Sequence, residues 1–154
     1  MRKIEKQVSD PAMIDAIIGR ADVIRIAMVK DNRPYLVPLN FGYDGKSFYI
    51  HSAKQGKKLD IIKENPNVWF ELTGKHAIVP SPYGCEWTCK YECVMGEGKA
   101  EILTDSQQKR HALDVIMEKY SPDKKYDYSD KSVDNVCMVK IDIENMIGKS
   151  DKEI

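Results

Sequence analysis

Short runs of β-branched and aromatic residues, joined mostly by a few turn-forming residues, recur along the chain and constrain its fold more than any other feature. Asp44-Gly45 joins two of these runs, and this pair is typical of the tight turn of a β-hairpin. Pro34 and Pro38 lie inside one run, which suits an edge strand or a bulge because proline has no amide hydrogen to donate. Strands are expected at residues 23–29, 33–43, 47–52, 67–73, 91–103 and 136–143. Five or six strands in short connections predict a mainly β fold, an antiparallel barrel with a few helices packed outside.

Helix signals occur in three segments between these strands. The first helix is expected to begin at Pro11, after a capping residue at Ser9 or Asp10, and the last begins with a capping box at Thr104 and Gln107. The side chains expected to face inward are Met13, Ile14, Ile17 and Ile18 in the first helix, and Leu113, Ile116, Met117 and Tyr120 in the last. The remaining expectations are a short helix at 56–65, a loop at 74–90 and a solvated charged segment at 148–154.

Length and charge exclude several classes of protein. The 154 residues carry 24 Lys and Arg against 24 Asp and Glu, so no bulk field favours nucleic acid or an anionic membrane. No apolar run approaches the roughly 20 residues that span a bilayer, and the charged segment MRKIEKQVSD lacks the apolar core of a signal peptide. We therefore expect a single domain over residues 1–154, located in the cytoplasm, with its four cysteines mostly reduced.

The stretch SFYIHSAKQGKKLD, residues 47–60, joins a strand that ends in histidine and small residues to a helix that begins near Gly56. Unpaired amide groups at a helix N-terminus carry partial positive charge and attract anions. Lys57 and Lys58 in the first turn disfavour the helix itself, so a bound anion would account for their position. Ser52 adds a hydroxyl donor. These residues indicate a phosphate site, with ordinary surface lysines as the alternative interpretation.

Three stretches together resemble a known family. They are VPLNFGYDGKSFYIHSAKQGKKLDIIKENPNVWFEL at 37–72, Cys85-Glu86-Trp87, and YECVMGEGKAEI at 91–102. With these stretches, the span from Ile24 to about Ile102 resembles the FMN-binding split-barrel superfamily of pyridoxamine 5'-phosphate oxidase, and within it the branch of 5-nitroimidazole-resistance proteins. The resemblance implies a six-stranded antiparallel split β-barrel with flanking helices, usually a homodimer that holds FMN in the groove between its subunits.

The resemblance also implies roles for individual residues. Lys57 and Lys58 match the basic pair that holds the FMN phosphate, and His51 lies at the strand end beside the phosphate and ribityl chain. Trp87 could cover the flavin groove of the partner subunit, or it could pack within its own chain. The residues expected to contact the cofactor are Val37, Pro38, Leu39 and Asn40 along the flavin ring, His51, Ser52, Ala53, Lys57 and Lys58 near the phosphate, and Trp87, Glu92 and Cys93.

The activity that the resemblance implies is two-electron reduction of a small electrophile, such as a nitroaromatic or a quinone. His51 is the candidate catalytic residue, because an imidazole can supply a proton near neutral pH, but it could also only contact the cofactor. NAD(P)H, if it is the electron donor, would bind transiently, because the chain has no dinucleotide-binding fingerprint. Oxidation of pyridoxamine phosphate is not expected, since residues 36–41 lack the family's basic residue and residues 139–154 contain no Arg or His.

Two other classes of function stay open at this stage. The barrel could hold haem, with His51 or His111 as axial ligand, or a deazaflavin at the same phosphate site. Alternatively, the protein could be a non-catalytic flavin store or sensor that acts through a partner. His76, and otherwise His111, are interpreted as surface residues.

Three closely spaced cysteines raise the question of a metal site, but their spacing does not favour one. Cys85, Cys89 and Cys93 follow a C-x3-C-x3-C spacing, which is not a common zinc spacing, and Cys137 lies in another strand. No metal site is expected. The cysteines are interpreted as small buried residues, with one reactive thiol near the flavin as a further option.

Overall fold

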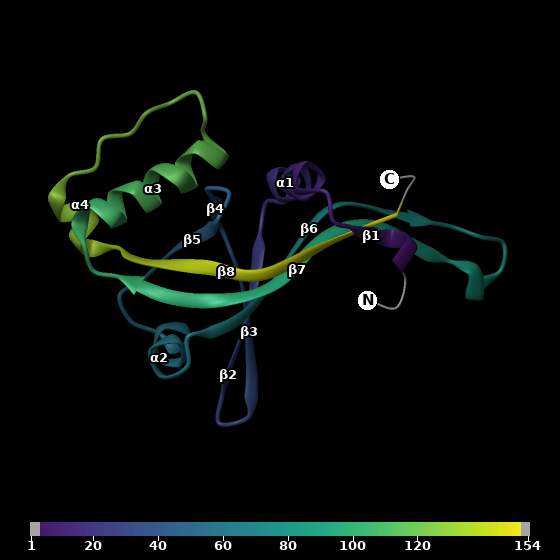
Figure 1. Cartoon of the computed structure of the whole chain (residues 1–154), viewed down its shortest axis with the longest axis horizontal. Helices are drawn as coiled ribbons and strands as arrows, with labels where there is room; N and C mark the ends of the chain where they lie inside the picture. The colour runs from purple at the N-terminus through teal and green to yellow at the C-terminus, as the bar shows by residue number, and fades with distance from the viewer. Residues whose placement is uncertain (1–3, 152–154) are drawn as a thin grey trace.

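The structure, a computed structural model, describes residues 4–151 (Figure 1). Its strands are β1 (Gln7–Val8), β2 (Ile24–Lys30), β3 (Arg33–Leu39), β4 (Gly42–Tyr43), β5 (Ser47–Ser52), β6 (Asn67–Val79), β7 (Thr88–Leu103) and β8 (Cys137–Ser150). Its helices are α1 (Pro11–Arg20), α2 (Lys57–Glu64), α3 (Ser106–Tyr120) and α4 (Asp130–Asn135), with 3-10 turns η1 (Ile4–Lys6) and η2 (Gly84–Glu86). Within the described residues, no helix has the length and apolarity needed to cross a bilayer.

All of these strands belong to one antiparallel sheet in the order β3-β2-β6-β7-β8-β5-β4, with β1 beside β8. The prediction of a mainly β, antiparallel fold with a few helices is confirmed. The predicted strand at 33–43 divides into β3 and β4, and the two-residue strand β1 was not predicted. β3 is an end strand, which suits Pro34 and Pro38, so one of its edges pairs with no described strand.

Side chains along the strands alternate between a buried inner face and an outer face. On β2, Ile24, Ile26 and Met28 are fully buried, whereas Arg25 and Val29 on the other face are exposed. This alternation places the main hydrophobic core on the inner face, where residues of α1 and α2 join it.

An aromatic cluster fills the middle of this core. The ring centroid of Phe48 lies 5.7 Å from that of Phe41 and 4.9 Å from that of Phe70, both in edge-to-face arrangements. The next residue along β5, Tyr49, points to the opposite side of the sheet and packs against α3 in a second cluster. The three longer helices therefore cover two faces: α1 and α2 contribute to the inner core, and α3 lies over the outer side of β5 and β8.

The expected loop at 74–90 is mostly strand. β6 continues to Val79 and β7 begins at Thr88, so residues 76–91 form a long hairpin, here called the β6–β7 arm. The arm extends away from the rest of the sheet in Figure 1. A register shift between Thr73 and His76 interrupts the pairing, and this bulge breaks the alternating pattern that would mark the strand in the sequence.

The prediction that residues 148–154 form a solvated segment is also partly wrong. β8 runs to Ser150, and its residues Gly148 and Lys149 pair with β7 on one side and β1 on the other. Residues 152–154 lie outside the described residues, as do residues 1–3 of the charged N-terminal segment.

The helix caps and inner faces were predicted in part. Asp10 caps α1 by accepting a hydrogen bond from the amide of Ala12, but α3 is capped by Asp105 rather than Thr104. Met13 and Tyr120, both expected to face inward, are 49% and 38% exposed. The buried positions of the two helices are Ile14, Ile17 and Ile18 in α1, and Ala112, Val115 and Ile116 in α3.

Candidate functional site

The connection from β5 to α2 has the form of an open anion site. Gly56 adopts a φ of 143°, a backbone region that favours glycine, and it is the N-cap of α2. Its carbonyl accepts hydrogen bonds from the amides of Leu59 and Asp60, at 2.9 and 3.2 Å. Among the described residues no side chain caps this helix start, so the amides at its N-terminal end are available to a ligand.

Lys57 brings the start of α2 to the end strand β3. Its ammonium lies 4.6 Å from the ring centroid of Tyr35, over the ring face. Lys57 is exposed and Lys58 is half-buried, and neither ammonium has an ion pair or hydrogen bond within residues 4–151. Two adjacent cations that no carboxylate of the described chain neutralises are available for an anion.

The predicted ring-contact residues lie along β3 and just after it. Val37 and Leu39 are half-buried against the inner core, whereas Pro38 and Asn40 are exposed. Because β3 pairs only with β2 among the described strands, the backbone groups on its other edge can bind a planar ligand. The structure thus places this free strand edge close to the basic start of α2.

The end of β5 places its three predicted residues in different settings. His51 is exposed, shares the outer face of β5 with Tyr49, and forms no hydrogen bond within the described chain. Ser52 is buried, and its hydroxyl donates to the carbonyl of Ala53 at 2.9 Å. Only the imidazole of His51 is therefore directly accessible from solvent as an acid or base.

Glu92, a predicted cofactor contact, lies in a structural ion pair. Its carboxylate accepts hydrogen bonds from Nε and Nη2 of Arg20, at 2.6 and 2.8 Å, and from the amide of Lys75 at 3.0 Å. The hydrogen bond from Arg20 holds the pKa of Glu92 below its usual value. The carboxylate fits against Gly74, where an added Cβ would come within 2.5 Å of Oε1. The pair joins the end of α1 to β7 and the β6 bulge, and the cofactor role of Glu92 stays a prediction.

Replacing Glu92 with glutamine should destabilise the fold by about 2 kcal/mol at neutral pH, because a buried carboxylate loses its charged hydrogen bonds. Since its pKa is lower in the folded state, the stabilisation is present above the usual value of 4.5 and is lost as pH falls through the lower folded value. Urea titrations at pH 7 and pH 3.5 will measure this. Equal destabilisation at both pH values would show that the charge of Glu92 is not the cause.

Cys93 and Trp87 complete the predicted set. Cys93 is buried, and this burial, with Glu71 nearby, raises the pKa of its thiol to about 11, so it is protonated at neutral pH. Trp87 is 56% exposed near the tip of the β6–β7 arm, where its indole N–H donates to the carbonyl of Ser81 at 2.7 Å. Figure 1 shows the arm extending away from the side of the molecule on which α2 lies.

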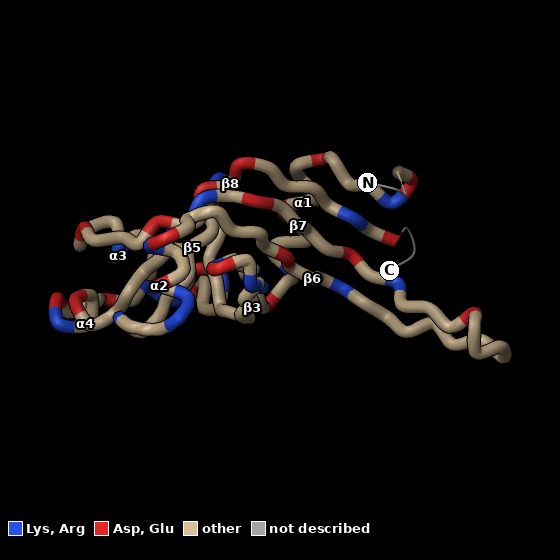
Figure 2. The backbone as a smooth tube through the Cα atoms, turned by 90° about the horizontal axis from the view of Figure 1, so that it is seen from below, with Lys and Arg blue, Asp and Glu red and all other residues tan. Residues whose placement is uncertain are grey.

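The outer sheet face carries a row of exposed apolar residues. Leu36, Ala27 and Trp69 lie side by side on β3, β2 and β6, and Leu36 and Trp69 are 57% and 56% exposed. Phe70, the next residue along β6, lies on the opposite face of the strand and is buried. Basic and acidic residues are interspersed over the backbone rather than gathered on one side (Figure 2).

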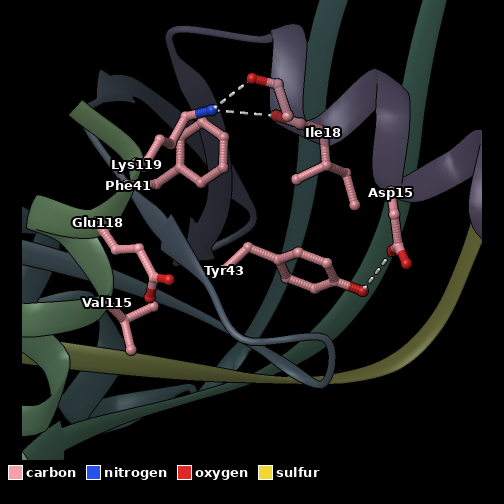
Figure 3. A pocket seen from close by; sticks show the side chains of 8 residues that line it. Asp15, Ile18, Phe41, Tyr43, Val115, Glu118 and Lys119 are labelled. Carbon is pink, nitrogen blue, oxygen red and sulfur yellow. Dashed lines mark hydrogen bonds between the residues drawn. The ribbon is translucent and has the colours of Figure 1, made fainter. Parts of the chain in front are cut away.

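A separate small pocket lies between α1 and α3 (Figure 3). Lys119 donates to the carbonyls of Ile18 and Gly19 at the end of α1, both at 3.1 Å, and burial lowers the pKa of its ammonium. Burial and the nearby Asp15 raise the pKa of Tyr43 to about 12. A cation at the carbonyl end of a helix is stabilising, so this pocket serves to join the two helices.

The cysteines do not gather around a common point. Cys85 and Cys89 are exposed on the β6–β7 arm, whereas Cys93 and Cys137 are buried, and all are free thiols. Within residues 4–151, no three His, Cys, Asp or Glu side chains are arranged to hold a metal ion. His111 stacks edge-to-face against Tyr49, with ring centroids 5.6 Å apart.

Similar proteins of known structure share this architecture. A candidate 5-nitroimidazole antibiotic resistance protein from Bacteroides thetaiotaomicron superposes with a TM-score of 0.83 at 35% identity, over 93% of this chain and 85% of that one. An FAD and haem binding protein from Mycobacterium smegmatis gives a TM-score of 0.86 at 20% identity, over 96% and 74% of the two chains. An FAD-binding protein from Mesorhizobium loti gives 0.68 at 22% identity, over 96% and 98%. The last two similarities show the fold alone.

Sequence comparison identifies the family. An uncharacterised protein of Rhizobium meliloti is 26% identical in an alignment of 83 residues, with 45% of this chain and only 54% of that relative's length covered. The sequence model of the pyridoxamine 5'-phosphate oxidase family matches residues 10–150. Since this match covers nearly the whole described chain, the protein belongs to the pyridoxamine 5'-phosphate oxidase family.

Proposed function

We propose that this protein is a cytoplasmic, FMN-binding homodimer that reduces small electrophiles such as nitroaromatics. The observation that carries the proposal is the position of Lys57 over Tyr35, which brings two unneutralised cations of α2 to the free edge of β3. This donor set fits a cofactor that combines a phosphate with a planar ring. Lys57 and Lys58 would hold the phosphate, and the backbone of residues 37–40 would contact the ring.

The homodimer is proposed from the outer face of the sheet. Leu36 and Trp69 expose apolar surface in one continuous row, and a second copy of the chain would cover it. Trp87 lies on the β6–β7 arm, which extends away from α2, so its proposed contact would be with the site of the partner subunit.

Bound FMN would supply hydride-transfer chemistry that no side chain of the protein can provide. For a nitro substrate the overall reaction is R–NO2 + NAD(P)H + H+ → R–NO + NAD(P)+ + H2O, so a proton source is needed beside the cofactor. His51 is exposed at the end of β5 and is the proposed proton donor. The four free thiols fit the proposed cytoplasmic location.

The function is tested by the absorption spectrum of the purified protein and by turnover. We expect a two-band oxidised flavin spectrum that stays with the protein through desalting after FMN is added, and nitroaromatic-dependent oxidation of NAD(P)H. His51→Gln should retain FMN and lower turnover by roughly 10²-fold. A single intense haem band, or a spectrum that shows no binding of added FMN, would contradict the flavin proposal. FMN binding without turnover would indicate that the protein is a flavin store or sensor and not an enzyme.

A further inference from the structure

We infer that a cavity between α3 and the outer face of the sheet binds a flat, uncharged ring that carries an amide, and that it discriminates against the same ring with a carboxylate. Among the described residues, none of those assigned to the cofactor lines this cavity. The inference deepens the proposed function by naming a class of substrate, and it rests on that function where the ligand of the cavity is identified as the substrate.

The cavity has a volume of about 450 Å³. Small-molecule sites in proteins commonly have volumes of about 300–1,000 Å³, so a substituted ring fits within it. The first half of α3 forms its wall where the helix passes over β5 and β8 (Figure 1), and Tyr49 and Leu103 are its buried apolar base. The residues that line the cavity are Tyr49, Leu103, Asp105, Gln107, Gln108, His111 and Lys140.

Two of the lining side chains are aromatic rings. The hydroxyl of Tyr49 is already used, because it donates to Oδ2 of Asp44 at 2.8 Å, so Tyr49 offers its ring to a ligand. The imidazole of His111 stands almost perpendicular to this ring, with an angle of 88° between the two planes. Aromatic faces and edges pack favourably against other flat rings, so this base favours an aromatic ligand.

The wall of the cavity carries hydrogen-bonding groups that the described chain does not use. Gln107 and Gln108 precede His111 by four and three residues on α3, so the three side chains lie on neighbouring turns of one helix face. Within residues 4–151, neither glutamine amide and neither nitrogen of His111 forms a hydrogen bond. A side-chain amide both donates and accepts, so the pair of glutamines is complementary to an amide on the ligand.

The charges around the cavity disfavour an anion. Of the described residues that line it, Lys140 is the one with a positive charge, and its ammonium lies 2.7 Å from Oδ1 of Asp142. Asp105 accepts a hydrogen bond from the amide of Gln108 at 2.9 Å, so the positive end of α3 already has its counter-charge. Glu101 lies opposite Lys140 on β7 and adds a further carboxylate. A ligand carboxylate would therefore be repelled, whereas an amide would not.

The cavity borders the proposed proton donor. His51 and Tyr49 share the outer face of β5, and they are one strand repeat apart, at about 6.6 Å along the backbone. Across the sheet His51 pairs with Met138, which pairs in turn with Leu103 at the base of the cavity. A ring bound in the cavity would lie near His51, where the proposed reaction needs its substrate.

The test uses the three histidines of the chain as reporters. Benzamide is titrated at pH 8 into the full chain without added flavin, and the imidazole Cε1–H signals are followed by NMR after assignment with single His→Gln variants. We expect benzamide to shift the signal of His111 with a Kd on the order of 1 mM, and to leave that of His76 on the β6–β7 arm unchanged. Benzoate should bind about ten-fold more weakly.

Three variants separate the contributions of charge and hydrogen bonding. Asp105→Asn keeps the helix cap, because asparagine caps as well as aspartate, and it should raise benzoate affinity about three-fold without changing that of benzamide. Gln107→Leu together with Gln108→Leu should lower benzamide affinity about ten-fold. Gln7→Leu, at an exposed glutamine of β1, is the matched control and should change neither affinity.

An unshifted His111 signal, equal affinities for benzamide and benzoate, or an unchanged benzamide affinity in the double glutamine variant would each overturn the inference. If benzamide binds as expected but the FMN-loaded chain does not reduce para-nitrobenzamide with NAD(P)H, the binding site is supported and the proposed function is contradicted. Reduction of para-nitrobenzamide by a chain whose His111 signal does not respond to benzamide would support the proposed function and overturn the inference.

Discussion

Replacing Lys57 and Lys58 together with alanine should weaken FMN binding by roughly a hundred-fold or more. Each charge-assisted contact to a phosphate is worth about 1.5–3 kcal/mol, and no other unpaired cation lies in the first turn of α2. Isothermal titration of FMN into the wild-type chain and the double variant will measure the loss. The two single variants will show how it divides between the exposed Lys57 and the half-buried Lys58.

The same double variant should fold as well as the wild-type chain. Lysines at a helix N-terminus oppose the helix dipole, so their removal is expected to raise the stability of the flavin-free protein slightly. Lys63→Ala, near the other end of α2, is the matched control and should retain full FMN affinity. If the double variant keeps its fold and its FMN affinity, the phosphate is bound elsewhere.

Truncating Phe48 to alanine should destabilise the protein by about 3–5 kcal/mol, through lost burial and the cavity left behind. Phe48 is fully buried, and its ring packs edge-to-face against Phe41 and Phe70. The Tyr43 ring lies in a tilted arrangement beside it, with ring centroids 5.0 Å apart. Since the total stability of a domain is about 5–15 kcal/mol, this single change would remove a large part of it. Urea unfolding followed by circular dichroism gives the value.

Phe48→Leu serves as the conservative comparison, because leucine refills much of the space and should retain most of the stability. Tyr83→Ala, at a side chain that is 67% exposed, sets the scale for a surface change. If Phe48→Ala lowers the free energy of unfolding no more than Tyr83→Ala does, the aromatic cluster does not hold the two sides of the sheet together.

The parts of the fold that were predictable from sequence are local ones. The hairpin turn at Asp44-Gly45, the short helix after Gly56 and the edge position of the strand with Pro34 and Pro38 all follow from the chemistry of a few adjacent residues. The β6–β7 arm was missed because its pairing depends on a bulge at residues 73–76, which interrupts the alternation of polar and apolar residues.

Some residues of the candidate site could likewise be predicted from the sequence, and others could not. Lys57 and Lys58 could be found because their position at a helix start conflicts with the helix dipole. The pairing of Arg20 with Glu92 could not be found, since 72 residues separate them and Arg20 lies outside the stretches that carry the family resemblance. Tyr35 was overlooked, although the turn at Asp31-Asn32, with φ values of 49° and 57°, and the two-residue period of β3 would have placed it on the same face as Val37 and Leu39.

The sheet order imposes a sequence of events on folding. β5 lies between β4 and β8, so its main partner is a strand whose residues follow it by about 85 to 95 positions along the chain. Until β8 is available, β5 and β7 each expose an unpaired edge, and pairings this distant along a chain form slowly. The α2 lysines directly follow β5, so the end of the protein proposed to bind phosphate depends on a strand pairing that is distant along the chain.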